Sequence, residues 1–269
     1  MRKWMVFFVL LLTVILAACS NEDAEGVFTK AMDVSGEMES AEVDMNITQI
    51  LSTSDESMEL EMESDMKAEI IMDPIAMYQK GTMNMEMDGF PMEMDTEMYM
   101  TEDGLYTYDS MSQTWMKLDN EMYTDLSNLA QQDPSAQLEM MEPFMDDVEY
   151  EEKDDSYIFR FAGEGEALNE FSESVIQEYL DTEMFADLGA DVNEVLESMT
   201  VNKLNYEMEI DKESYETKTF YMDLDMALSA EGEEMSIAQQ VNAVYTGINT
   251  IDSIEVPQEV LDNATEMSY

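Results

Sequence analysis

The sequence contains no histidine, so the side chain most often used in catalysis and metal binding near neutral pH is missing. This absence excludes Ser-His-Asp and Cys-His catalysis, together with the usual zinc and copper(II) ligand sets. No phosphate-binding loop and no G-x-G-x-x-G run occurs. Acidic residues number 63, so no pair stands out as the two carboxylates of a glycosidase. We therefore expect a protein that is not an enzyme, holds no metal in a conventional site and uses no cofactor.

Basic residues are also scarce. The chain has 11 Lys and Arg against 63 Asp and Glu, which gives a net charge of −52. Such a charge repels nucleic acid and anionic headgroups, so we expect no nucleic-acid partner. The acidity favours adaptation to a salty or alkaline exterior, where salt screens the repulsion between carboxylates. A low-affinity cation-binding surface is the other interpretation. Hydrophobic residues make up 45% of the chain and follow regular periods, which argues against disorder.

There is a single cysteine, Cys19, so no disulfide can form and the fold must rest on its core. The chain opens with the basic residues Arg2 and Lys3 and an apolar run over residues 4–16, as secretory signals do. That run is too short to span a bilayer comfortably as a permanent helix.

The residues Leu16-Ala17-Ala18-Cys19 resemble the bacterial lipobox. The resemblance implies cleavage before Cys19, diacylation of its sulfur, and anchoring to the outer face of the cell membrane. Two acyl chains anchor a protein stably, whereas one binds only reversibly. We thus expect a signal peptide over residues 1–18, a lipidated tether over 19–25 and a single domain over 26–269.

Apolar residues recur with period two along most of the mature chain, which is typical of strands with one buried face. Even positions of the stretch Met58–Met72 are mostly apolar, while odd positions are mostly charged or polar. The same alternation predicts two meanders, over residues 43–118 and 204–245. Turns are expected at Asp73-Pro74 and around Asp88-Gly89.

Helical spacing of apolar residues is found before and between the two meanders. It predicts helices over residues 26–40, 120–131, 135–148, 166–180 and 192–199. A short terminal strand that runs into a helical turn is expected over residues 256–261. The economical fold is α+β: a curved antiparallel sheet, an open half-barrel, with helices covering its concave face.

Three short segments within this order resemble a known superfamily. They are Met98-Tyr99 with Asp103-Gly104-Leu105-Tyr106, Trp115-Met116-Lys117-Leu118, and Ile254-Glu255-Val256-Pro257-Gln258-Glu259-Val260. With the lipobox they resemble the LolA/LppX-like half-barrels, the bacterial lipoprotein-carrier proteins, and among them the uncharacterised surface lipoproteins of Gram-positive bacteria. The resemblance implies a hydrophobic cavity between sheet and helices that holds an acyl chain or another apolar ligand. It identifies no individual binding residue.

Methionine is unusually frequent, with 30 residues. Strict alternation with acids favours methionine as the flexible apolar residue of the inner face, suited to varied ligands. The candidate cavity residues are Met58, Leu60, Met62, Met66, Ile70, Met72, Met83, Met85, Met208, Met222 and Met226.

These observations predict a membrane-anchored lipoprotein that binds or carries a hydrophobic ligand. Its partners would be the membrane, through the lipid anchor, and that ligand, while any protein partner stays unspecified. Two alternatives are open. One is a copper(I)-binding protein, because Met-x-Met spacing gathers soft thioethers on one strand face. The other is a structural or interaction lipoprotein whose core is filled by its own side chains.

Overall fold

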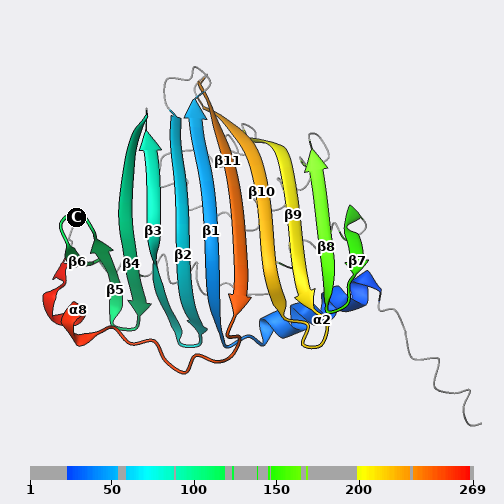
Figure 1. Cartoon of the computed structure of the whole chain (residues 1–269), viewed down its shortest axis with the longest axis horizontal. Coiled ribbons are helices and arrows are strands. Elements are labelled where there is room, and N and C mark those ends of the chain that lie inside the picture. The colour runs from blue at the N-terminus through cyan, green and yellow to red at the C-terminus, as the bar shows by residue number, and fades with distance from the viewer. Residues whose placement is uncertain are drawn as a thin grey trace, which may run out of the picture.

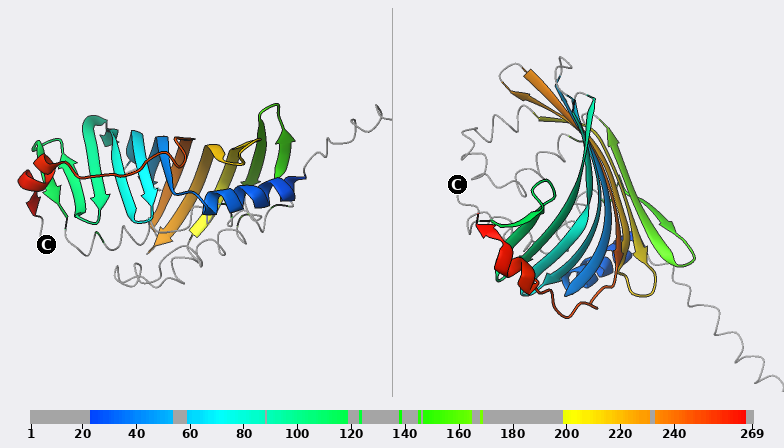
Figure 2. Two further views of the ribbon diagram at one scale, coloured as in Figure 1. Left: turned by 90° about the horizontal axis from the view of Figure 1, so that it is seen from below. Right: turned by 60° about the vertical axis from the view of Figure 1, so that its left-hand side comes forward.

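The computed structural model describes residues 23–53, 59–87, 89–118, 147–164, 199–230 and 233–266, together with Tyr123, Leu138, Met145 and Leu168. Twelve strands among these residues form one open sheet (Figure 1). The sheet is twisted and curved (Figure 2). No helix among the described residues is long and apolar enough to cross a membrane.

The elements follow one another as two meanders with short helices at their ends. The first meander contains β1 (Ser40–Thr53), β2 (Glu59–Met72), β3 (Ile75–Met87), β4 (Phe90–Thr101), β5 (Gly104–Asp109) and β6 (Thr114–Lys117). The second contains β7 (Glu149–Glu152), β8 (Ser156–Glu164), β9 (Met199–Asp211), β10 (Thr217–Ala230) and β11 (Glu233–Thr246). The other elements are α2 (Ala24–Gly36), α8 (Gln258–Asn263) and β12 (Thr265–Glu266).

The strand order is β12-β6-β5-β4-β3-β2-β1-β11-β10-β9-β8-β7, and every pairing is antiparallel except that of β12 with β6. The first and last long strands, β1 and β11, pair over most of their length, from Glu42 opposite Thr246 to Thr53 opposite Met235. This pairing joins the two meanders into one continuous sheet.

Tight turns fix the register of the first meander. Met72 pairs with Ile75, and Met87 pairs with Phe90, so a two-residue turn closes each hairpin. Gly89 in the second turn has φ +80°, a conformation that glycine adopts without steric cost. Each residue of β2, β3 and β4 therefore lies opposite one defined residue on the neighbouring strand.

This register separates the two faces of the sheet. One face, here called the apolar face, carries the even residues of β2, such as Met62 and Met66, and the odd residues of β3, such as Met83. The opposite face, called the acidic face, carries residues such as Glu61 and Glu86. The alternation of apolar and charged residues in the sequence thus places apolar side chains on one face of the sheet and charged side chains on the other.

The best-packed core lies where α2 crosses β8 and β9 on the apolar face (Figure 1). The Asp23 side chain caps the helix by accepting a hydrogen bond from the Gly26 amide at 2.9 Å. Val27, Phe28 and Ala31 are buried on the underside of the helix. The Phe28 ring packs against Phe159 at 5.8 Å between centroids. These contacts close one end of the apolar face.

Helix α8 packs on the acidic face at the other end of the sheet. Its Val260, with Val256 before it, covers the buried ring of Tyr106. Neighbouring aromatic rings continue the cluster, since Tyr99 lies 5.6 Å from Trp115 between centroids. The terminal segment 256–261 begins as coil and not as the short strand that we expected, whereas the two-residue strand β12 was not anticipated.

The predicted α+β fold with helices covering the concave face was wrong. Within the described residues only α2 and α8 are complete helical elements, and of these two α2 packs on the apolar face, where Leu138 and Leu168 join its core. Its 13 residues span about 20 Å. Twelve strands at about 4.8 Å spacing make a sheet roughly 50 Å wide, too wide for one short helix to cover. The described part is a large open β-sheet, and the curved antiparallel sheet is the part of the prediction that agrees.

The individual helix predictions have different outcomes. The helix expected over residues 26–40 is α2, which ends at Gly36, and Ser40 already begins β1. The helices expected over residues 120–131, 135–148 and 166–180 lie almost wholly outside the described residues. The one expected over 192–199 also lies outside them, apart from Met199, which begins β9.

Like charges face each other across strands of the acidic face. Glu61 pairs with Glu86, and Glu42 pairs with Glu69. Opposite charges also meet, as in the ion pair between Lys67 Nζ and Asp44 Oδ1 at 2.7 Å, but with both side chains largely exposed such a pair contributes little. Repulsion between carboxylates therefore dominates this face.

We expect the midpoint temperature of thermal unfolding to rise as NaCl is increased from low to molar concentration, because salt screens this repulsion between carboxylates. Each kcal/mol of repulsion removed raises the midpoint by roughly 2–4 °C in a domain of this size. Glu86→Gln should raise the low-salt midpoint and reduce its salt dependence. Asp44→Asn is the matched control, because it removes a charge that Lys67 already compensates. A midpoint that stays flat or falls with salt would contradict adaptation of this surface to salt.

Candidate functional site

The apolar face brings together ten of the eleven sequence-predicted cavity residues. From β2 they are Leu60, Met62, Met66, Ile70 and Met72; from β3, Met83 and Met85; from β9, Met208; and from β10, Met222 and Met226. The apolar face extends across the sheet from strand to strand. Met62 lies opposite Met85 in the first meander, and Met222 lies opposite Val241 in the second. Met58 lies outside the described residues.

Burial divides these residues into two groups. Met208 is 2% exposed and belongs to the core under α2, and Met222 and Met226 pack at the edge of that core. By contrast, Met62 and Met83 are only half-buried and are in none of the hydrophobic clusters formed by the described residues. The face is therefore closed near α2 and open over β2 and β3 in the described part of the chain.

No charged side chain occurs on the apolar face of β2, β3 and β4. The positions on this face are the even residues of β2 from 60 to 72, the odd residues of β3 and the even residues of β4 from 90 to 100. In a chain with a net charge of −52, this is a large uncharged surface. Phe90 is 78% exposed and Met92 47% exposed at its margin. Exposed apolar patches of this kind mark ligand or partner sites.

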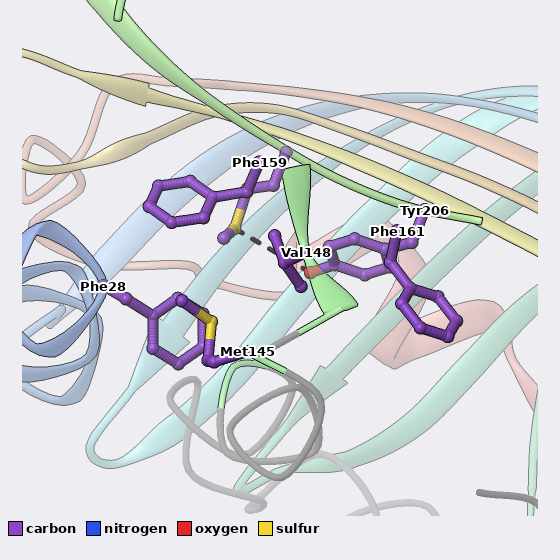
Figure 3. Close-up of a pocket in the computed structure, with 7 residues that line it drawn as sticks. Phe28, Met145, Val148, Phe159, Phe161 and Tyr206 are labelled. Atoms are coloured by element: carbon purple, nitrogen blue, oxygen red, sulfur yellow. Dashed lines mark hydrogen bonds between the residues drawn. The ribbon is translucent and has the colours of Figure 1, made fainter. Parts of the chain in front are cut away.

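A small apolar pocket opens between α2 and the strands β8 and β9 (Figure 3). The space that a water molecule can enter in it is about 10 Å³, roughly the room for one water. The side chains that line it are those of Phe28, Met145, Val148, Phe159, Phe161, Tyr206 and Met208. Small-molecule sites usually measure roughly 300–1,000 Å³, so the lining side chains fill this pocket almost completely and it is far smaller than a lipid site.

Tyr206 carries the polar group of this pocket. Its hydroxyl donates a weak hydrogen bond to the sulfur of Met208 at 3.8 Å. Burial raises the pKa of Tyr206, so the phenol stays neutral at physiological pH. The described side chains that line the pocket therefore offer a neutral, mainly apolar surface. Among the described residues, no group of three or more Asp, Glu, His or Cys could hold a metal ion.

Sequence reasoning predicted only Met208 of the residues that line this pocket. Alternating aromatic residues at Tyr157, Phe159 and Phe161 were the signal that could have shown Phe159 and Phe161. Pairing of Phe159 with Met208 and of Phe161 with Tyr206 puts them on the apolar face.

A comparison with protein families gives one match, over residues 23–265, to the family described as "Family of unknown function (DUF6612)". The chain belongs to this family. The match covers all the described elements of the DUF6612 protein except the last residue of β12. No curated protein matches the sequence.

Three solved structures with distant likeness to the DUF6612 chain illustrate its similarity to known proteins. A structure described as showing lipid-protein interactions in lipovitellin aligns over 81% of this chain with 8% identity and a TM-score of 0.34. This chain spans only 26% of that lipovitellin chain.

Two bacterial proteins of unknown function are also similar in part. A DUF1329 family protein from Desulfovibrio piger aligns over 86% of this chain and 94% of its own, with 8% identity and a TM-score of 0.25. A beta-barrel-like DUF1849 protein from Brucella abortus aligns over 78% and 99%, with 7% identity and a TM-score of 0.18. At these scores the likenesses say nothing about ligands.

Proposed function

We propose that this DUF6612 protein binds a hydrophobic ligand, such as a lipid or the acyl chain of a lipoprotein, on the apolar face of its sheet. Binding would be physical and would need no catalysis. The observation that carries the proposal is the uncharged, half-exposed apolar face of β2, β3 and β4 in a strongly acidic chain. A soluble domain rarely leaves such a surface without a ligand or partner.

Methionine suits this role because its unbranched side chain adapts to ligands of different shape. Each methylene removed from water contributes about 0.8 kcal/mol. Ten methylenes of an acyl chain would contribute about 8 kcal/mol, which is comparable to the roughly 4–15 kcal/mol that association costs. The affinity for an acyl chain thus depends on how many of its methylenes the apolar face covers.

We also propose that the protein is held at the outer face of the cell membrane by lipid on Cys19, as a carrier of the LolA/LppX-like type. The lipobox and the resemblance of the sequence segments support this proposal. Asp23, the cap of α2, is only four residues after Cys19. Four residues extend at most about 14 Å, so the tether would keep α2 and its pocket near the bilayer surface.

Titration with a fluorescent fatty-acid probe tests the proposed ligand site. We expect the unmodified protein to bind the probe and Met83→Asp to weaken binding by more than about tenfold, because an unpaired carboxylate on the apolar face opposes burial of the ligand. Thr82→Asp is the matched control, since Thr82 is the preceding residue and lies on the opposite face. It adds the same charge and should leave probe affinity unchanged.

Thermal unfolding of both variants separates lost binding from lost folding. The proposal fails if the folded, unmodified protein binds no probe, or if Thr82→Asp weakens binding as much as Met83→Asp.

A further inference from the structure

Five methionines meet at one end of strands β2, β3 and β4 on the apolar face. Met85 on β3 lies directly between Met62 on β2 and Met92 on β4. In the next row Met83 pairs with Met94. Directly opposed residues in an antiparallel pair have Cβ atoms about 4.5–5.5 Å apart, a spacing that flexible methionine side chains span. Register alone therefore places Met85 beside Met62 and Met92, and Met83 beside Met94, in two adjacent rows of one patch.

The two tight turns of the first meander build this cluster. The β3–β4 hairpin places the segment Met83-x-Met85 against Met92-x-Met94 in reverse order, and the β2–β3 hairpin adds Met62. The intervening acids Glu61, Glu86 and Glu93 alternate with the methionines and occupy the acidic face. The cluster thus consists of neutral sulfur donors, with carboxylates held on the other side of the sheet.

Core packing does not account for these five methionines within the described chain. At the other end of the same strands, Met77, Met98 and Met100 pack with Ile75 and Leu105 in a hydrophobic cluster. The five methionines introduced above belong to no such cluster of described residues, and one of them, Met92, is 47% exposed. The sequence uses the same residue type for packing at one end, whereas at the other end Met62, Met83, Met85 and Met94 are half-buried and Met92 is exposed.

We propose that Met62, Met83, Met85, Met92 and Met94 form a copper(I)-binding site. Thioethers are soft ligands that select copper(I) over hard cations such as magnesium and calcium. Methionine carries no proton to displace, unlike the cysteine, histidine and carboxylate ligands of conventional sites. The net charge of −52 raises the local concentration of cations, while the sulfur cluster supplies the selectivity. Met85, with a methionine across each neighbouring strand, is the central ligand.

Anaerobic titration of the full mature chain with copper(I), in competition with a chromogenic copper(I) chelator, tests this site. We expect the triple variant Met62→Leu, Met85→Leu, Met92→Leu to lose more than about tenfold in affinity, because leucine keeps the apolar volume and removes the sulfur. The matched control is Met77→Leu, Met98→Leu, Met100→Leu, which removes three thioethers from the packed end and should bind copper(I) like the unmodified protein.

X-ray absorption of the copper-loaded protein gives a second readout. We expect sulfur scatterers around copper, and an excess of magnesium should not displace the metal. The proposal is overturned if the unmodified protein fails to compete for copper(I), if the first triple variant binds as the unmodified protein does, or if the ligand shell is oxygen only. The first triple variant should still bind the fatty-acid probe, so failure of the copper site and failure of the hydrophobic site are distinguishable.

Discussion

Replacing Phe159 by alanine is expected to lower the free energy of unfolding by about 3–5 kcal/mol, a large part of the roughly 5–15 kcal/mol that holds a domain folded. Phe159 is 2% exposed and lies at the centre of the core between α2 and the sheet. Its ring packs against Phe28 at 5.8 Å and Tyr150 at 5.2 Å between centroids. Alanine would leave a cavity that connects with the existing pocket. Denaturant unfolding followed by circular dichroism measures the loss.

Phe90→Ala is the matched control for this prediction. It removes the same side chain from a residue that is 78% exposed, at the margin of the apolar face. The free energy of unfolding should change by less than about 0.5 kcal/mol, as for most surface substitutions. If the two variants lost equal stability, the core under α2 would not be the main source of stability in this sheet.

The second large effect concerns the membrane. Cys19→Ser is expected to abolish acylation, leaving unprocessed precursor or protein released into the medium, because serine has no sulfur to receive the diacylglycerol. Cell fractionation with immunodetection, combined with mass spectrometry of the N-terminus, measures both outcomes. Ser20→Ala changes the next residue and should be processed and retained as the unmodified protein is. Normal processing and membrane retention of the Cys19→Ser protein would contradict the lipobox assignment.

The local alternation of apolar and polar residues was enough to predict most of the strands and which face of each is apolar. The alternation from Leu60 to Met72, broken only at Ser64 and Ile71, predicts a strand with one apolar face, because successive side chains point to opposite sides. The turns at Asp73-Pro74 and around Gly89 are short, so each strand folds back on its predecessor and the neighbouring apolar rows align. Within the candidate site, this determines that Met62, Met83 and Met85 share one surface.

Only the tertiary structure decided how the two meanders combine and which methionines stay accessible. Alternation shows which face of a strand is apolar, but it does not select a partner strand far away in the sequence. The pairing of β1 with β11 therefore could not be predicted, and this pairing makes a sheet too wide for the described helices to cover. Met208 and Met62 look alike in sequence, yet Met208 is buried under α2 while Met62 is half-exposed. Met208 lies in the core formed with α2, Leu138 and Leu168, and Met62 does not, because burial depends on what packs above a residue and not on its own strand.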